Sequence, residues 1–108
     1  MAKISDVVIT CYKKEWEAFA CDNAYNPFVK CAKISEYPST DLVNVSWEFI
    51  KWYTKDIYID EIIDYFNNHD FLLTTLDDDN NVFQQDHVSD DSMISEFWDY
   101  APQVKLVV

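Results

Sequence analysis

The clearest hydrophobic pattern in the first half of the chain has a helical period. Its apolar positions, three or four residues apart, are Leu42, Val45, Phe49 and Trp52. Residues with this spacing share one side of a helix. Asp41 stands where an acid favours the positive end of a helix dipole, and Ser39 or Thr40 can supply the N-terminal cap. We therefore expect a helix that begins at Asp41.

A second helix is predicted directly afterwards, with Asp56 as its N-terminal cap. Its apolar side is made by Ile59, Ile62, Ile63 and Phe66. Asp60, Glu61 and Asp64 lie away from that side and are expected to face solvent. The helix should end near residues 67–68, because asparagine replaces glycine well at a left-handed C-terminal position.

The N-terminal third is less clear. Two interpretations stay open for residues 5–21. The apolar spacing favours one helix capped by Ser5, whereas the β-prone residues 7–10 favour a strand followed by a short helix. After a loop, residues 28–34 are expected to form a short strand.

The pattern at the end of the chain predicts a hairpin followed by a helix and a strand. Residues 71–76 and 82–88 are predicted strands, joined by an acidic turn at 77–81. A helix is expected from Ser89 or Asp90 to about Tyr100, and a C-terminal strand over residues 103–108. The chain of 108 residues suits a single domain, residues 1–108. The predicted fold class is α+β, with three to four helices packed on a short, mainly antiparallel sheet.

Two residue types are missing from the composition, since the chain contains neither glycine nor arginine. Phosphate-binding loops need glycine where the backbone approaches the phosphate closely. Arginine is the preferred residue for bidentate recognition of phosphate. The sequence therefore argues against direct binding of nucleotides or nucleic acid.

The net charge of −12 is confined to one half of the chain. Residues 1–55 are neutral, with seven lysines and seven acids, whereas residues 56–108 hold thirteen acids and one lysine, Lys105. These acids repel one another, and this costs stability. Solubility is one explanation of this acidic half, and complementarity to a basic partner is the other.

Aromatic residues make up 17% of the chain, which is more than so small a core easily hides. We expect some of them at the surface as interface anchors. The three cysteines fit neither a disulfide framework nor a zinc site, and are expected to be reduced thiols in the core. No signal peptide or membrane-spanning run is recognisable, so a cytoplasmic protein without membrane partners is expected.

Candidate metal and catalytic groups are few. Asp77, Asp79 and Asn81 match the first ligand positions of a calcium loop, but its required glycine and glutamate are absent. The pairs His69-Asp70 and Asp86-His87 are the remaining candidates for a metal site or a shared proton. We expect exposed residues at the ends of elements there, and therefore no metal, no cofactor and no enzyme activity.

The function that fits best is inhibition by binding. A small acidic domain suits the basic active site of a nucleic-acid-acting protein, whose lysine and arginine groove holds phosphates. The expected partner-binding residues are Asp60, Asp64, Asp70, Asp77, Asp78, Asp79, Asp86, Asp90, Asp91, Glu96, Trp98, Asp99 and Tyr100. Trp98 and Tyr100 would be aromatic anchors ringed by acids.

This character is similar to that of immunity proteins, which neutralise nuclease toxins, although no motif of that class is present. Two alternatives remain. One is a viral inhibitor that mimics DNA to block a host defence enzyme, and the other is a non-catalytic adaptor subunit. Immunity is preferred because the charge is confined to one half, as expected for a single docking face.

Overall fold

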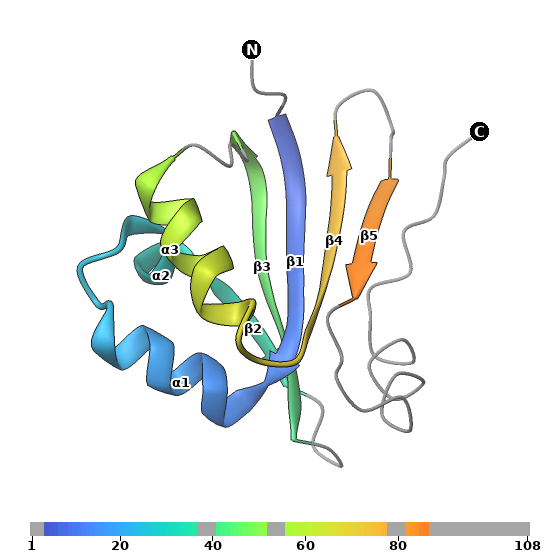
Figure 1. Cartoon of the computed structure of the whole chain (residues 1–108). Helices are drawn as coiled ribbons and strands as arrows, with labels where there is room; N and C mark the ends of the chain where they lie inside the picture. Colours follow the sequence, from blue (N-terminus) through green and yellow to red (C-terminus); the bar gives the residue numbers. More distant parts are fainter. Residues whose placement is uncertain (1–3, 37–40, 52–55, 78–81, 87–108) are drawn as a thin grey trace.

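The computed structural model describes residues 4–36, 41–51, 56–77 and 82–86. These residues form five strands and three short helices (Figure 1). The elements in chain order are β1 Ile4–Tyr12, α1 Lys13–Asp22, α2 Pro27–Cys31, β2 Lys33–Glu36, β3 Leu42–Lys51, α3 Ile57–Phe66, β4 Phe71–Asp77 and β5 Val82–Asp86.

The described strands form one sheet with the order β2-β3-β1-β4-β5, in which all neighbours are antiparallel. β1 therefore occupies the centre. The connection from β1 to β2 runs through α1 and α2 and skips β3, and the connection from β3 to β4 runs through α3 and skips β1. These two crossovers give the βαββαβ connectivity of ferredoxin-like sheets, extended by β5 beside β4.

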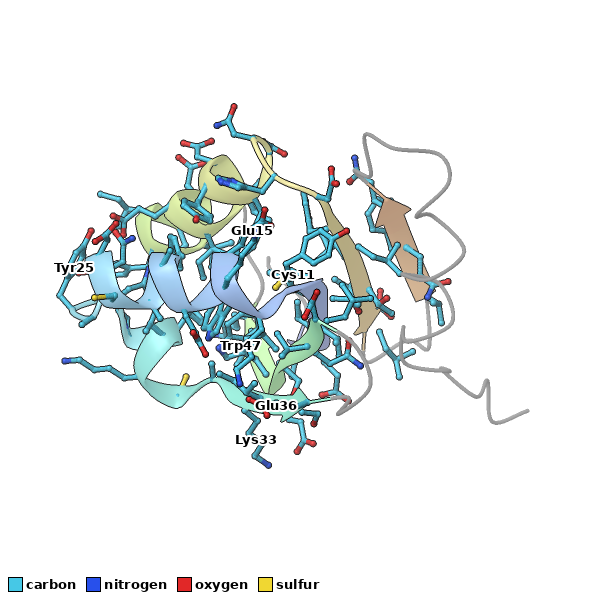
Figure 2. The ribbon with its side chains drawn as sticks, turned by 90° about the horizontal axis from the view of Figure 1, so that it is seen from below. Cys11, Glu15, Tyr25, Lys33, Glu36 and Trp47 are labelled. Atoms are coloured by element: carbon cyan, nitrogen blue, oxygen red, sulfur yellow. The ribbon has the colours of Figure 1, made fainter. Side chains whose placement is uncertain are left out.

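The helices cover one face of this sheet (Figures 1 and 2). The buried cluster between them includes Val7, Ile9, Cys11, Trp16, Phe19, Val43, Val45, Trp47, Ile62, Phe66, Phe71 and Leu73. Trp16 of α1 lies among the aromatic residues, with its ring centroid 6.1 Å from Trp47 and 6.3 Å from Phe66. Aromatic packing thus joins α1 and α3 to the central strands.

The second face of the sheet is also buried along its central strands. Thr10, Asn44 and Leu72 lie side by side on β1, β3 and β4, and none of them is more than 8% exposed. The Thr10 hydroxyl donates a hydrogen bond of 2.6 Å to Asn44 Oδ1, which satisfies both buried groups. A strand buried on both faces loses the simple alternation of apolar and polar residues.

The predicted fold class is wrong, because the sheet and not a set of packed helices dominates the described structure. β1 and β3 contain nine and ten residues, and the longest helices contain ten. A strand rises about 3.3 Å per residue and a helix about 1.5 Å, so strands of this length extend twice as far. The sheet is therefore long, and the helices are short covers on one of its faces.

The predicted helix from Asp41 is the largest local error, since residues 42–51 form β3. Val43, Val45 and Trp47 alternate with polar or small neighbours and all face the core. This period of two is the signal of a strand, and valine favours strands. The helical spacing of the predicted apolar set was coincidental.

Of the two interpretations of residues 5–21, the strand followed by a helix is correct. The predicted strand over residues 28–34 is wrong in its first part, because α2 begins at Pro27. Proline suits the first position of a helix, and the Asn26 side chain caps α2 by accepting a 2.9 Å hydrogen bond from the Phe28 N–H. The strand begins only at Lys33.

The helix predicted from Asp56 and the strand predicted over residues 71–76 are confirmed. Asp56 Oδ1 accepts hydrogen bonds from the N–H groups of Tyr58 (2.8 Å) and Ile59 (3.4 Å), and α3 ends at Phe66. Asn67 itself stays right-handed, with φ −61°, so it does not supply the left-handed cap.

The predicted β4–β5 hairpin is also present. The acidic turn at 78–81, the helix over 89–100 and the C-terminal strand over 103–108 lie outside the described residues.

Candidate functional site

The outer side of α3 combines apolar and acidic residues. The helix buries Ile59, Ile62 and Phe66 against the sheet, and this turns Ile57, Asp60 and Asp64 outward along one ridge. Ile57 is 69% exposed, which is unusual for a large aliphatic side chain. The second ridge begins with Tyr58, which is 37% exposed, and continues through Glu61.

The connection between α1 and α2 packs against this helix through Asn26, which is fully buried. Its side-chain Nδ2 donates to the Tyr58 carbonyl at 3.0 Å and more weakly to Glu61 Oε1 at 3.4 Å. Its Oδ1 meanwhile caps α2, as described above. One buried amide therefore fixes the positions of α2 and α3 relative to each other.

Tyr25, next to Asn26, completes this surface. Its hydroxyl donates a short hydrogen bond to Glu61 Oε2, while its ring remains 58% exposed. The hydrogen bond to Glu61 is the main reason why the pKa of Tyr25 is raised. Figure 2 shows Tyr25 at the outer end of the helical layer, away from Cys11 and Trp47.

We call these residues the tyrosine-acid surface, which consists of Tyr25, Ile57, Tyr58, Asp60, Glu61 and Asp64. Its carboxylates have no cationic partner within the described part of the chain. The sequence contains no lysine or arginine from Asp56 to Val104 that could supply one. A basic partner would therefore meet an uncompensated negative field around exposed apolar groups.

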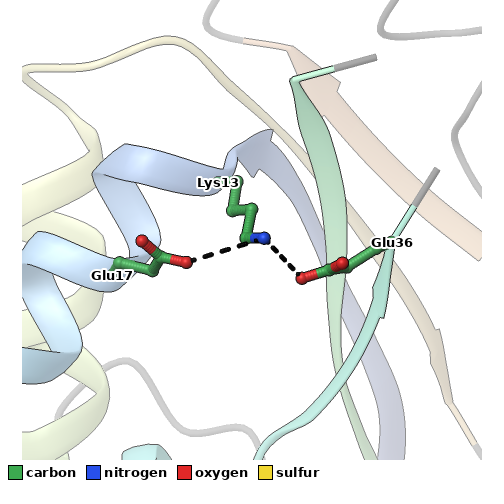
Figure 3. A network of polar contacts seen from close by, with 3 residues as sticks. All are labelled: Lys13, Glu17 and Glu36. Atoms are coloured by element: carbon green, nitrogen blue, oxygen red, sulfur yellow. Dashed lines mark ion pairs between the residues drawn. The ribbon is translucent and has the colours of Figure 1, made fainter. Parts of the chain in front are cut away.

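Two ion pairs lie away from the tyrosine-acid surface, at the start of α1. Lys13 Nζ lies 2.9 Å from Glu36 Oε1 of β2 and 3.9 Å from Glu17 Oε1 (Figure 3). A hollow of about 640 Å³ lies nearby, lined by Tyr12, Lys13, Lys14, Glu15, Glu17 and Asp41. Because both signs of charge line it, it does not favour an ion of either sign.

The predicted partner-binding acids do not form one cluster. Asp60 and Asp64 lie together on α3, whereas Asp70 and Asp77 flank opposite ends of β4 and have interactions of their own. Asp86 ends β5, opposite Leu72. The remaining predicted residues, Asp78, Asp79, Asp90, Asp91, Glu96, Trp98, Asp99 and Tyr100, lie outside the described residues.

Four residues of this surface were not among the predicted partner-binding residues, although Glu61 was expected to face solvent: Tyr25, Ile57, Tyr58 and Glu61. A signal for two of them was present, because Ile57 and Tyr58 do not belong to the apolar side of the predicted helix. Tyr25 had no such signal, since only the buried contacts of Asn26 bring it to α3. The prediction that some aromatic residues reach the surface is confirmed.

The histidine and cysteine candidates have structural roles where they are described. His69 is half-buried, not exposed as predicted, because its ring stacks on Tyr65 at 4.3 Å and its Nδ1 lies 2.8 Å from the Tyr65 carbonyl. No group of three or more metal-binding side chains occurs in the described ranges. Asp79, Asn81 and His87 lie outside these described ranges.

Cys11 is buried as predicted, and burial raises the pKa of its thiol, which disfavours the reactive thiolate. The prediction is wrong for Cys21 and Cys31, which are exposed. Both lie on the outer sides of short helices.

Glu15 of α1 is the one described side chain with a buried oxygen, Oε2, that lacks a hydrogen-bond partner. Its pKa is raised, chiefly by burial and further by Asp70, although His69 and Lys14 oppose the shift. This is a cost to the fold, because the ionised carboxylate is poorly solvated there.

The chain matches no family model, no curated protein and no solved structure. In the part of the chain that the structure describes, the helices are too short and too polar to traverse a lipid bilayer. Its function is therefore inferred from its own residues and contacts.

Proposed function

We propose that this chain is a non-catalytic, cytoplasmic inhibitor-type binding protein that docks on a basic protein. The partner proposed is a nuclease toxin or another nucleic-acid-acting enzyme, with this chain as an immunity protein that covers its positively charged active site. The observation that carries the proposal is the tyrosine-acid surface, where exposed apolar groups stand among carboxylates that pair with no cation of the described residues.

The two kinds of residue on this surface have complementary roles in binding. Asp60 and Asp64 lie one helical turn apart, with about 5–6 Å between their Cβ atoms. Carboxylates at this spacing suit a groove whose lysines and arginines hold successive phosphates. Ile57, Tyr58 and Tyr25 supply the apolar area that a long-lived complex needs at its centre. The charges would then set the rate of association, and the apolar contact would set the lifetime of the complex.

The first test is capture of the partner. The tagged chain is immobilised and exposed to extract of the source cells at low and at high NaCl, and bound proteins are identified. We expect one basic nuclease, held at low salt and weakened at high salt, because exposed charges are screened over about 8 Å at physiological ionic strength. The captured enzyme should then lose activity when an equimolar amount of this chain is added.

The second test compares two double charge reversals. Asp60→Lys/Asp64→Lys changes the tyrosine-acid surface, and Asp41→Lys/Glu48→Lys makes the same charge change at exposed residues outside it. The first variant should slow association about tenfold or more at low salt, and the second should have a much smaller effect. Equal effects, or no basic partner at either salt, would refute the proposal.

The identity of the partner decides between the proposal and its alternatives. Capture of a host defence enzyme that acts on DNA would favour a viral DNA mimic. A stable partner whose binding is unchanged by both variants and by salt would favour an adaptor subunit that is acidic for solubility.

A further inference from the structure

Two exposed tyrosine rings stand beside a fixed carboxylate at the first turns of α3. Tyr58 and Glu61 are three residues apart and therefore neighbours on the helix surface. Tyr25 reaches the same carboxylate from the connection between α1 and α2 by donating its hydroxyl hydrogen bond to Glu61 Oε2. Two aromatic side chains and one negative charge thus come together from segments distant in sequence.

This arrangement is held in place before any partner arrives. The buried Asn26 side chain binds both the Tyr58 carbonyl and Glu61 Oε1, and its backbone N–H donates to the Asn23 carbonyl at 2.9 Å. Tyr25 is held at its hydroxyl by the hydrogen bond to Glu61. A site whose groups are already ordered loses less entropy when it binds.

The site also has unused binding capacity. Neither tyrosine ring packs on another ring within the described part of the chain, so ring surface stays accessible. The hydrogen bonds to Glu61 come from neutral donors, and no described cation balances its charge. The exposed Asp60 lies beside it on α3 and adds to the negative field.

We propose that Tyr25, Tyr58 and Glu61 form a binding site for an arginine side chain presented by the partner protein. This inference rests on the proposed function for the identity of the partner, and it adds which of the partner's side chains is recognised. A guanidinium group can lie against an aromatic ring while it donates two parallel hydrogen bonds to a carboxylate. Lysine offers a compact, more strongly hydrated charge and cannot match both contacts.

The test uses a small probe and does not need the partner. The protein, labelled with ¹⁵N and ¹³C, is titrated with N-acetyl-arginine methylamide, and its NMR spectra are recorded. We expect saturable shift changes at the rings of Tyr25 and Tyr58 and at the Glu61 side chain. The norleucine analogue, which has no charge, should produce none of them, and the lysine analogue should bind more weakly.

Variants then test each contact. Tyr25→Ala and Glu61→Gln should each weaken binding of the arginine probe by about two- to fivefold, the range expected for an exposed cation–π or ion-pair contact. Tyr25→Phe keeps the ring but loses the hydroxyl, so its effect should be smaller than that of Tyr25→Ala. Glu48→Gln removes a carboxylate elsewhere and should leave the probe affinity unchanged. Unchanged spectra in the remainder of each variant confirm that it is folded.

The outcomes separate this inference from the proposed function. Arginine-induced shifts that are spread over all the acidic residues, or that survive both Tyr25→Ala and Glu61→Gln, would overturn the arginine site. The proposed function would still stand if the captured nuclease were inhibited and Asp60→Lys/Asp64→Lys slowed its association. Conversely, saturable arginine binding with no basic partner in the capture experiment would support the site and refute the proposed function.

Discussion

α1 and α3 are both ten-residue helices on the same face of the sheet, but they differ in how the charged side chains on their exposed sides are paired. At the start of α1, Lys13 lies between two carboxylates, and its pKa is raised chiefly by the hydrogen bond to Glu36. Along α3, Asp60 and Asp64 face solvent, and no cation among the described residues pairs with them.

Under the proposed function, this difference separates a surface that supports the fold from one that would meet a partner. Compensated charges on α1 connect the helix to β2 across the surface, at little cost. Uncompensated carboxylates repel one another and lower the stability of the fold, so the reason to keep them lies in solubility or in binding. Association with a basic protein would supply that reason, since the repulsion would be relieved in the complex.

The largest effect on the free energy of unfolding is expected within α3, where a residue of its buried side is compared with one of its exposed side. Phe66→Ala removes a fully buried ring that packs on Trp16 and Phe71, and should lower the free energy of unfolding by about 3–5 kcal/mol. Ile57→Ala truncates an exposed side chain and should change it by less than about 0.5 kcal/mol. Urea unfolding measures both. A large loss for Ile57→Ala would show that this residue supports the fold and is not kept for binding.

A smaller effect, on the melting temperature, is expected when charges are removed from α1 and from α3 in separate variants. Lys13→Met keeps the aliphatic stem, removes the ion pairs and should lower the melting temperature. Asp64→Asn removes a charge near the C-terminal end of α3, together with its repulsion from Asp60, and should raise it. Both differences from the wild type should shrink as NaCl is added, because salt screens exposed charges. The wild-type protein itself should melt slightly higher in moderate NaCl, and a fall would contradict the assigned repulsion.

The smallest effect on the free energy of unfolding is expected at Glu15. The direction of its pH dependence follows from the raised pKa of this residue. The folded state holds this proton more tightly than the unfolded state, so the penalty is absent at pH values below the ordinary pKa of a glutamate. It grows as the pH rises through the folded pKa and persists at neutral pH. Glu15→Gln should therefore stabilise the protein at pH 7 and not at pH 4. Urea unfolding of both proteins at the two pH values tests this, and an equal difference at both would contradict it.

The sequence predicted α3 well because local signals agree there. Asp56 is a good cap, and the isoleucines that follow have a helical period on one side of the segment. The same kind of spacing misled the prediction for β3, where the period of two at Val43, Val45 and Trp47 is the stronger signal. Burial of both faces of β3, which is set by its position in the sheet, weakened that alternation.

The candidate site was only partly predictable for a similar reason. The exposure of Asp60 and Asp64 follows from the helical period alone. The position of Tyr25 follows from Asn26, a buried polar residue whose partners lie more than thirty residues away in the chain. Contacts of this kind come from tertiary structure and leave no local pattern in the sequence.

The central position of β1 has a consequence for the synthesis of the protein. β1 leaves the ribosome before both of its neighbours in the sheet, and one of these neighbours is β4, so that Cys11 pairs with Phe71. Until most of the described chain has been made, the middle of the sheet has one open edge and an apolar face without α3. Such long-range pairing slows folding and exposes strands to other chains.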